Sequence, residues 1–239
     1  MTLPEFFGCA FLAFGPPLAL FTMTIAQDPI RIIILVAAAF LWLCSLLLSS
    51  LVWFIFVPLR DVTIFGMVIS IIIQEAFRYG IYRVLRETEN GLQLVSDNSR
   101  IVENKHILAY VSGLGFGIMS GAFALVNILA DSVGPATVGL LEGHQYFLLT
   151  SSAQALCMIL LHTFWSVIFF NAVDTQSRLH IGYVIVSHLI VSCITLLNSY
   201  QMYTLTLTTS YFITVATAVI AFRVVGGTKD SFTRFITCK

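Results

Sequence analysis

Long apolar runs separated by short polar stretches dominate the pattern of this chain. Seven such runs carry few or no charges, and each is long enough to cross a bilayer as a helix. They cover residues 6–26, 30–57, 62–83, 107–130, 146–171, 179–198 and 203–225. The pattern predicts an all-α, polytopic membrane protein, in which a bundle of seven transmembrane helices forms one domain over residues 1–239.

The first run also has the position of a cleaved signal peptide. However, Met1 to Glu5 contains no positive charge, and an apolar stretch of about 20 residues exceeds the roughly 7–15 that is usual for a signal peptide. Gly15-Pro16-Pro17 lies in its middle, where a kinked membrane helix is tolerated. We therefore interpret this run as the first membrane helix.

The positions of the basic residues predict the orientation, because Lys and Arg in short loops are retained on the cytosolic side. With the N-terminus on the lumenal or extracellular side, only Arg60 lies on that side. The other basic residues then lie at or near the cytosolic side: Arg31, Arg78, Arg83, Arg86, Arg100, Lys105, Arg178, Arg223, Lys229, Arg234 and Lys239. We therefore expect a cytosolic C-terminus.

Composition limits the classes of partner. Hydrophobic residues make up 58% of the chain and charged residues 10%, whereas soluble domains have about 25% charged residues. Twelve basic residues balance twelve acidic ones, so no net field attracts nucleic acid. The five cysteines are scattered singly, which argues against a disulfide framework and a zinc module. Membrane lipid is the expected surrounding, and no nucleic-acid partner is expected.

Three glycines in the fourth run share one helical face. Gly113, Gly117 and Gly121, which we call the glycine stripe, are four residues apart. A stripe without side chains lets another backbone approach closely, so we predict a tightly packed partner helix. That helix belongs either to this chain or to another protein, and the spacing does not separate the two interpretations.

Polar residues inside the apolar runs form a second group, which we call the intramembrane polar pocket: Gln74, Glu75, Arg78, His162 and His188. Counted from the expected cytosolic helix ends, Glu75 and both histidines lie at one depth, roughly 12–14 Å along the helical rise. A charge near the bilayer centre costs about 2.5–3.5 kcal/mol, so we expect these groups to satisfy one another. Arg78 either pairs with Glu75 or extends to the cytosolic surface.

Two histidines and a glutamate also suit a catalytic zinc ion with water as the fourth ligand. The alternative is that each histidine is satisfied by a neighbouring helix. The aspartates Asp28, Asp61, Asp131 and Asp174 all fall at the ends of apolar runs. The chain therefore holds no intramembrane aspartate pair and is not by itself an aspartyl protease.

Long phrases of the sequence resemble the anterior-pharynx-defective (Aph) subunit of γ-secretase, and the resemblance runs nearly end to end. The shorter cytosolic loop and tail resemble an insect-type member. The matching phrases are Phe6-Phe7-Gly8-Cys9, Ala13-Phe14-Gly15-Pro16, Asp28-Pro29-Ile30-Arg31-Ile32-Ile33, Gln74-Glu75-Ala76-Phe77-Arg78, Ala109-Tyr110-Val111-Ser112-Gly113-Leu114-Gly115-Phe116-Gly117 and Leu160-Leu161-His162-Thr163-Phe164-Trp165.

This resemblance implies a non-catalytic scaffold without a metal or cofactor. The scaffold would bind nicastrin, presenilin and the presenilin enhancer, with presenilin supplying the catalytic aspartates for cleavage of Notch-type and amyloid-precursor-type substrates. It implies an assembly role for the glycine stripe, and it maps the family's polar cluster and histidines onto the intramembrane polar pocket. It also implies residence in the endoplasmic reticulum, Golgi and plasma membrane.

Two other functions are alternatives. An intramembrane CAAX-type metalloprotease, a distantly similar class, would use Glu75, His162 and His188. Those enzymes use a pair of glutamates, and Gln74 stands at the first position of that pair; its amide cannot act as a general base. A seven-helix receptor matches the topology alone, because the last run contains no Asn-Pro-x-x-Tyr.

Overall fold

The computed structural model describes residues 3–59, 62–89, 91, 105–133 and 146–237. Within these residues the chain forms helices and no strands. The predicted outer residue Arg60 and the central parts of the two longest predicted loops, 92–104 and 134–145, lie outside the described residues.

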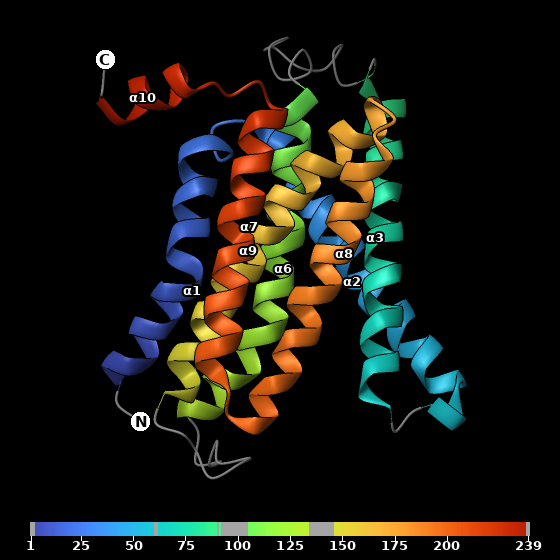
Figure 1. Cartoon of the computed structure of the whole chain (residues 1–239), viewed down its shortest axis with the longest axis vertical. Coiled ribbons are helices and arrows are strands. Elements are labelled where there is room, and N and C mark those ends of the chain that lie inside the picture. Colours follow the sequence, from blue (N-terminus) through green and yellow to red (C-terminus); the bar gives the residue numbers. More distant parts are fainter. Residues whose placement is uncertain (1–2, 60–61, 90, 92–104, 134–145, 238–239) are drawn as a thin grey trace.

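Seven long helices run side by side in one bundle (Figure 1). They are α1 (Leu3–Thr24), α2 (Pro29–Ile55), α3 (Thr63–Glu87), α6 (Lys105–Val133), α7 (Phe147–Asp174), α8 (Arg178–Ile194) and α9 (Tyr203–Val224). Short 3₁₀ helices, η1 (Val57–Leu59) and η2 (Thr195–Tyr200), follow α2 and α8. The short helix α10 (Lys229–Thr237) lies to one side of the bundle, near the end at which α9 finishes (Figure 1).

Each of the seven apolar runs corresponds to a helix that is long and apolar enough to cross a membrane. This confirms the predicted all-α, seven-helix class. The α3 segment has the lowest mean hydropathy of the seven, 1.5, because it contains Gln74, Glu75 and Arg78. The start of α1 and the end of α9 lie at opposite ends of the bundle (Figure 1); which end faces the cytosol stays a prediction.

Helix α7 is the centre of the bundle. In its apolar stretch 72% of the residues are buried, compared with 56% in α6 and 17–33% in the other five helices. It packs against α1, α6, α8 and α9, and its Trp165, Ile168 and Phe170 are among the largest fully buried side chains. The remaining helices surround α7 and α6 and expose apolar side chains, as expected for surfaces that face lipid.

A row of small hydroxyl side chains joins α9 to α7 and α8. The row consists of Thr206, Ser210, Thr214 and Thr217, all buried. Ser210 accepts a hydrogen bond from the Gln154 amide at 3.3 Å, and the Thr217 hydroxyl lies 2.8 Å from the Tyr183 hydroxyl. Small hydroxyl residues let membrane helices approach closely and hydrogen-bond across the interface. The row therefore supplies the directional contacts that fix α9 on the bundle.

The start of α2 is fixed by a side-chain cap. Asp28 has an extended backbone, its Oδ1 accepts a hydrogen bond from the Ile30 backbone N–H at 3.0 Å, and Pro29 follows at the first helical position. A carboxylate at this position satisfies one of the unpaired N–H groups of the first turn, and proline there sacrifices no hydrogen bond. The cap sets where the chain leaves the α1–α2 turn.

We expect Asp28→Ala to lower the free energy of unfolding by about 1 kcal/mol, because it removes the capping acceptor. The control is Asp28→Asn, which keeps an oxygen at the same place and should lose much less. Thermal unfolding of the purified chain in detergent micelles measures both. Equal losses for the two variants would show that the cap does not stabilise the helix.

Candidate functional site

The guanidinium of Arg78 is buried inside the bundle, with none of its side chain exposed. It has five N–H donors, and each has an acceptor. Nε and Nη2 donate to the two oxygens of Glu75 at 3.0 and 3.2 Å. Nη2 also donates to His162 Nδ1 at 2.9 Å, and Nη1 donates to the His162 carbonyl oxygen at 3.2 Å and to the Ser166 hydroxyl. The charged group is thus completely satisfied between α3 and α7.

Helix α8 joins this network through His188. Its Nδ1 lies 2.8 Å from Glu75 Oε1, which also accepts from Arg78. A carboxylate only accepts hydrogen bonds, so His188 carries a proton on Nδ1. Glu75 therefore makes two kinds of contact: it pairs with Arg78 of its own helix α3, and it accepts a hydrogen bond from His188 of α8.

Aromatic rings enclose the network. The His188 ring stacks on Trp165, with centroids 4.5 Å apart, and makes an edge-on contact with the His162 ring at 5.1 Å. Phe116 of α6 covers the Arg78 guanidinium, 5.1 Å from the ring centroid. Apolar walls of this kind exclude water and strengthen the polar contacts inside them.

Gln74 hydrogen-bonds to other residues than the remaining members of the predicted pocket do. Its Oε1 accepts a hydrogen bond from Trp42 Nε1 of α2 at 3.3 Å, and its Nε2 donates to Ser70 at 3.1 Å. The structure thus brings Glu75, Arg78, His162 and His188 together and directs the Gln74 side chain toward α2. Gln74 therefore connects α3 to α2, whereas Glu75 and Arg78 connect α3 to α8 and α7.

The structure decides between two alternatives for Arg78 and the histidines. Extension of Arg78 to the cytosolic surface is wrong, because its side chain stays fully buried. The arrangement also does not fit a zinc site, since the Arg78 cation occupies the space between Glu75 and His162. Among the described residues, no group of three His, Cys, Asp or Glu side chains is placed to hold a metal ion. The metalloprotease interpretation is not supported.

The glycine stripe faces α7 of the same chain. A Cβ atom at Gly117 would lie 2.6 Å from the Ile159 carbonyl oxygen, and one at Gly113 would lie 2.7 Å from the Cβ of Ser166. At Gly121 the nearest atoms belong to the Ile159 side chain, with Cδ1 at 2.5 Å. Contacts this short leave no room for a side chain, so the place of the predicted partner helix is taken by α7.

Three contributors to this site were not singled out in the sequence. Gly115, on the other face of α6, lies so close to α2 that a Cβ there would overlap the Leu35 carbonyl oxygen. Ser166 accepts a hydrogen bond from Arg78. Asp174, at the end of α7, accepts from Arg86 at 3.1 Å and pairs α3 with α7 a second time. Only the glycine carried a signal, because it falls between two members of the stripe.

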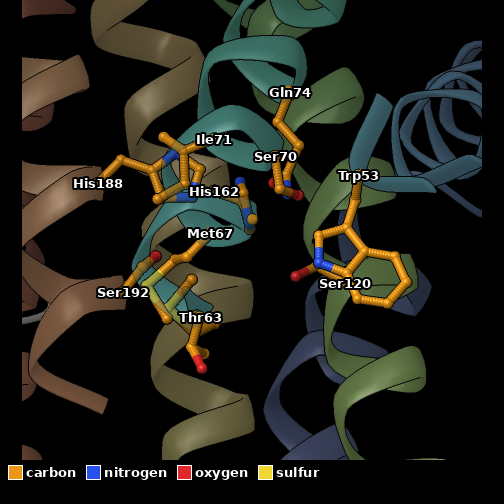
Figure 2. A pocket seen from close by; sticks show the side chains of 12 residues that line it. Trp53, Thr63, Met67, Ser70, Ile71, Gln74, Ser120, His162, His188 and Ser192 are labelled. Carbon is orange, nitrogen blue, oxygen red and sulfur yellow. The ribbon is translucent and has the colours of Figure 1, made fainter. Parts of the chain in front are cut away.

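A cavity of about 510 Å³ opens beside the network, along the first half of α3. Figure 2 shows His162 and His188 directed into it from α7 and α8. Its other walls are Trp53, Thr63, Gly66, Met67, Ser70, Ile71, Gln74, Ser120, Met158 and Ser192. None of these residues carries a formal charge, so the cavity is a neutral space lined by hydroxyl, amide and apolar groups.

Comparison with known proteins shows which family the chain is similar to. Residues 4–228 match the family model described as Aph-1 protein. The chain is 64% identical to the gamma-secretase subunit Aph-1 of Drosophila melanogaster, over the whole of both chains. It is 48% identical to gamma-secretase subunit Aph-1b of Danio rerio over 100% of this chain and 95% of the relative. It is 30% identical to gamma-secretase subunit aph-1 of Caenorhabditis elegans, over 94% and 82% of the two chains.

We predict that Arg78→Met lowers the free energy of unfolding by about 3–5 kcal/mol, because Glu75 is left as an unpaired buried charge. The double variant Glu75→Met and Arg78→Met removes both charges and should recover part of this loss. Chemical unfolding in detergent micelles compares the two. A double variant less stable than Arg78→Met would contradict the ion pair as the main reason for the arginine.

The glycine stripe should show graded sensitivity to added methyl groups. Gly117→Ala meets backbone atoms and should cost about 1–3 kcal/mol, the usual range for overpacking. Gly121→Ala meets the end of the Ile159 side chain, which can move, and should cost less. Gly80→Ala is the matched control, since its Cβ would have no neighbour within 4 Å. Equal unfolding midpoints for the Gly117 and Gly80 variants would refute the close packing.

Proposed function

Because this chain belongs to the Aph-1 family, we propose that it is a membrane-embedded, non-catalytic subunit of a γ-secretase complex. The family model covers nearly the whole chain, and the fruit fly and zebrafish relatives named as γ-secretase subunits align over its full length. The identity of 64% to the fruit fly protein agrees with the predicted insect-type member. The relatives thus support the complex, and the geometry of the polar network supports the non-catalytic role.

The main support for the non-catalytic role is that both carboxylate oxygens of Glu75 already accept hydrogen bonds. A general base must have an oxygen within hydrogen-bond reach of the proton it removes. Both Glu75 oxygens instead accept bonds from Arg78, and one accepts a further bond from His188. The carboxylate is used to join helices, which is the role expected of a scaffold.

We propose that the internal contacts of the scaffold act on its partners indirectly, by fixing the shape of its outer surface. The network joins α3 to α7 and α8, and the glycine stripe joins α6 to α7, so the shape of the bundle is set from within. The outer faces keep large exposed apolar side chains, including Phe11 and Phe40 near the start of the chain and Phe212 on α9. We propose that lipid and the helices of presenilin, nicastrin and the presenilin enhancer cover such faces. Substitutions in the glycine stripe then disturb assembly by distorting this surface.

The charge distribution supports a lumenal or extracellular N-terminus and a cytosolic C-terminus. We propose residence in the endoplasmic reticulum, Golgi and plasma membrane, where the complex would cleave Notch-type and amyloid-precursor-type substrates. In this assignment the aspartates that cleave the substrate belong to presenilin, and the present chain contributes its fold.

A Glu75→Gln variant distinguishes a scaffold from an enzyme. The tagged chain is expressed with presenilin, nicastrin and the presenilin enhancer, and both the recovered complex and the cleavage rate per complex are measured. A structural Glu75 predicts a several-fold lower recovery, because the amide weakens the buried pair with Arg78. The complexes that do assemble should cleave at the rate of the unmodified complex.

Glu87→Gln is the matched control, since it makes the same change on the exposed part of α3, where the Glu87 side chain is 64% exposed. It should alter neither recovery nor rate. A Glu75→Gln complex recovered in normal amount with its cleavage rate per complex abolished would overturn the non-catalytic assignment.

A further inference from the structure

Helix α9 ends in a turn that redirects the chain. Gly226 has a left-handed backbone with φ 87°, and its N–H donates to the Arg223 carbonyl oxygen at 3.0 Å. The Gly227 N–H donates to the Phe222 carbonyl oxygen at 2.9 Å. This pair of hydrogen bonds is the Schellman motif, which satisfies carbonyl groups of the last helical turn. The motif therefore sets the direction in which the chain leaves its last membrane-spanning helix.

The next helix, α10, begins close to this point. Four residues separate the end of α9 at Val224 from the start of α10 at Lys229. The Thr228 N–H donates to the Ser231 hydroxyl at 2.9 Å, and the Ser231 N–H donates back to the Thr228 hydroxyl at 3.2 Å. These reciprocal bonds have the form of a capping box and fix the start of the helix. Because four residues extend at most about 14 Å, α10 lies close to the membrane surface at which α9 ends.

Helix α10 takes little part in the packing of the bundle. It lies to one side, near the end at which α9 finishes, with its axis crosswise to α9 (Figure 1). Among the described residues, none of the seven long helices packs extensively against it. It has nine residues, and an isolated helix of this length is only marginally stable in water. A stable α10 therefore needs a surface that covers one of its sides.

The sequence of α10 has an apolar and a polar side. Phe232, Phe235 and Ile236 have the spacing i, i+3, i+4 and share one side of the helix, as in amphipathic helices generally. Polar residues occupy the rest of the circumference, and Thr233 and Arg234 among them are exposed. Phenylalanine on one side and basic residues on the other are typical of a helix that lies in the plane of the membrane interface.

The exposed charges near α10 are mostly positive. They are Arg223, Lys229 and Arg234, against the single acidic residue Asp230. The cytosolic leaflet carries anionic lipids, which attract basic residues close to its surface. We propose that α10 binds this surface, with its apolar side in the headgroup region and its basic residues near anionic headgroups. Only the choice of leaflet rests on the cytosolic C-terminus proposed above.

Amide hydrogen exchange of the full-length chain in lipid nanodiscs tests the proposal. The discs contain phosphatidylcholine either alone or mixed with phosphatidylserine in both leaflets. The result then depends neither on the orientation of the chain nor on the γ-secretase assignment. We expect the amides of residues 233–237 to exchange about tenfold more slowly in the discs with phosphatidylserine. At about 1 M salt, where the screening length falls to about 3 Å, this difference should disappear.

Two matched variants test the apolar side. Phe235→Gln removes a large apolar side chain from that side, and the exchange of the α10 amides in anionic discs should become about tenfold faster. Thr233→Gln introduces the same residue on the polar side and should leave the exchange unchanged. Glutamine is a good helix former, and neither variant alters the charge, so the comparison isolates the contact of the apolar side with lipid.

Three results would overturn the proposal. Equal exchange in the two kinds of disc would show that anionic lipid does not bind α10. Equal acceleration by the two variants would show that the apolar side has no special contact. Slow exchange seen only when other subunits are added would show that protein, and not lipid, covers the helix. Because the disc comparison uses the unmodified chain, it decides the matter whatever the variants do to folding.

Discussion

The structure depends on the permanent charge of one buried side chain. Arginine cannot lose its proton in a protein, so Arg78 must be matched by acceptors wherever the fold places it. Five acceptors meet its five donors, supplied by Glu75, His162 and Ser166. Two of these three residues lie on α7, the central helix. The position of α3 in the bundle is thereby tied to the rotation of α7 about its own axis.

This constraint relates features that lie far apart along the chain. Ser166, which accepts a hydrogen bond from Arg78, and Thr163, which follows the Arg78 partner His162, are also the residues that a Cβ atom at Gly113 would meet. The close approach of α6 at the glycine stripe and the satisfaction of Arg78 therefore use the same turn of α7. The two histidines take their tautomers from the same ion pair, since one faces the cation and the other faces the anion.

Much of this was predictable from the sequence, because the bilayer restricts the choices. Length and apolarity alone predicted seven helices, and counting residues from the helix ends placed Glu75, His162 and His188 at one depth. Depth, however, does not determine which way a helix is rotated. For this reason Gln74 was grouped with Glu75 although it faces Trp42 of α2. Ser166 gave no reason to be selected, and the position of Gly115 within the stripe did not show that it faces α2. The sequence also did not identify the helix that packs against the glycine stripe. Close packing needs small residues whether the neighbouring helix belongs to the same chain or to another protein.

A double-mutant cycle between Gly113→Ala and Arg78→Met tests most directly whether the stripe and the ion pair form one structural unit. The free energy of unfolding is measured in micelles for the parent chain, the two single variants and the double variant. If Ser166 links the two sites, the losses should be non-additive by about 0.5–3 kcal/mol. Additivity within about 0.3–0.5 kcal/mol would show that the two sites act independently, and would contradict a bundle organised around the buried charge of Arg78.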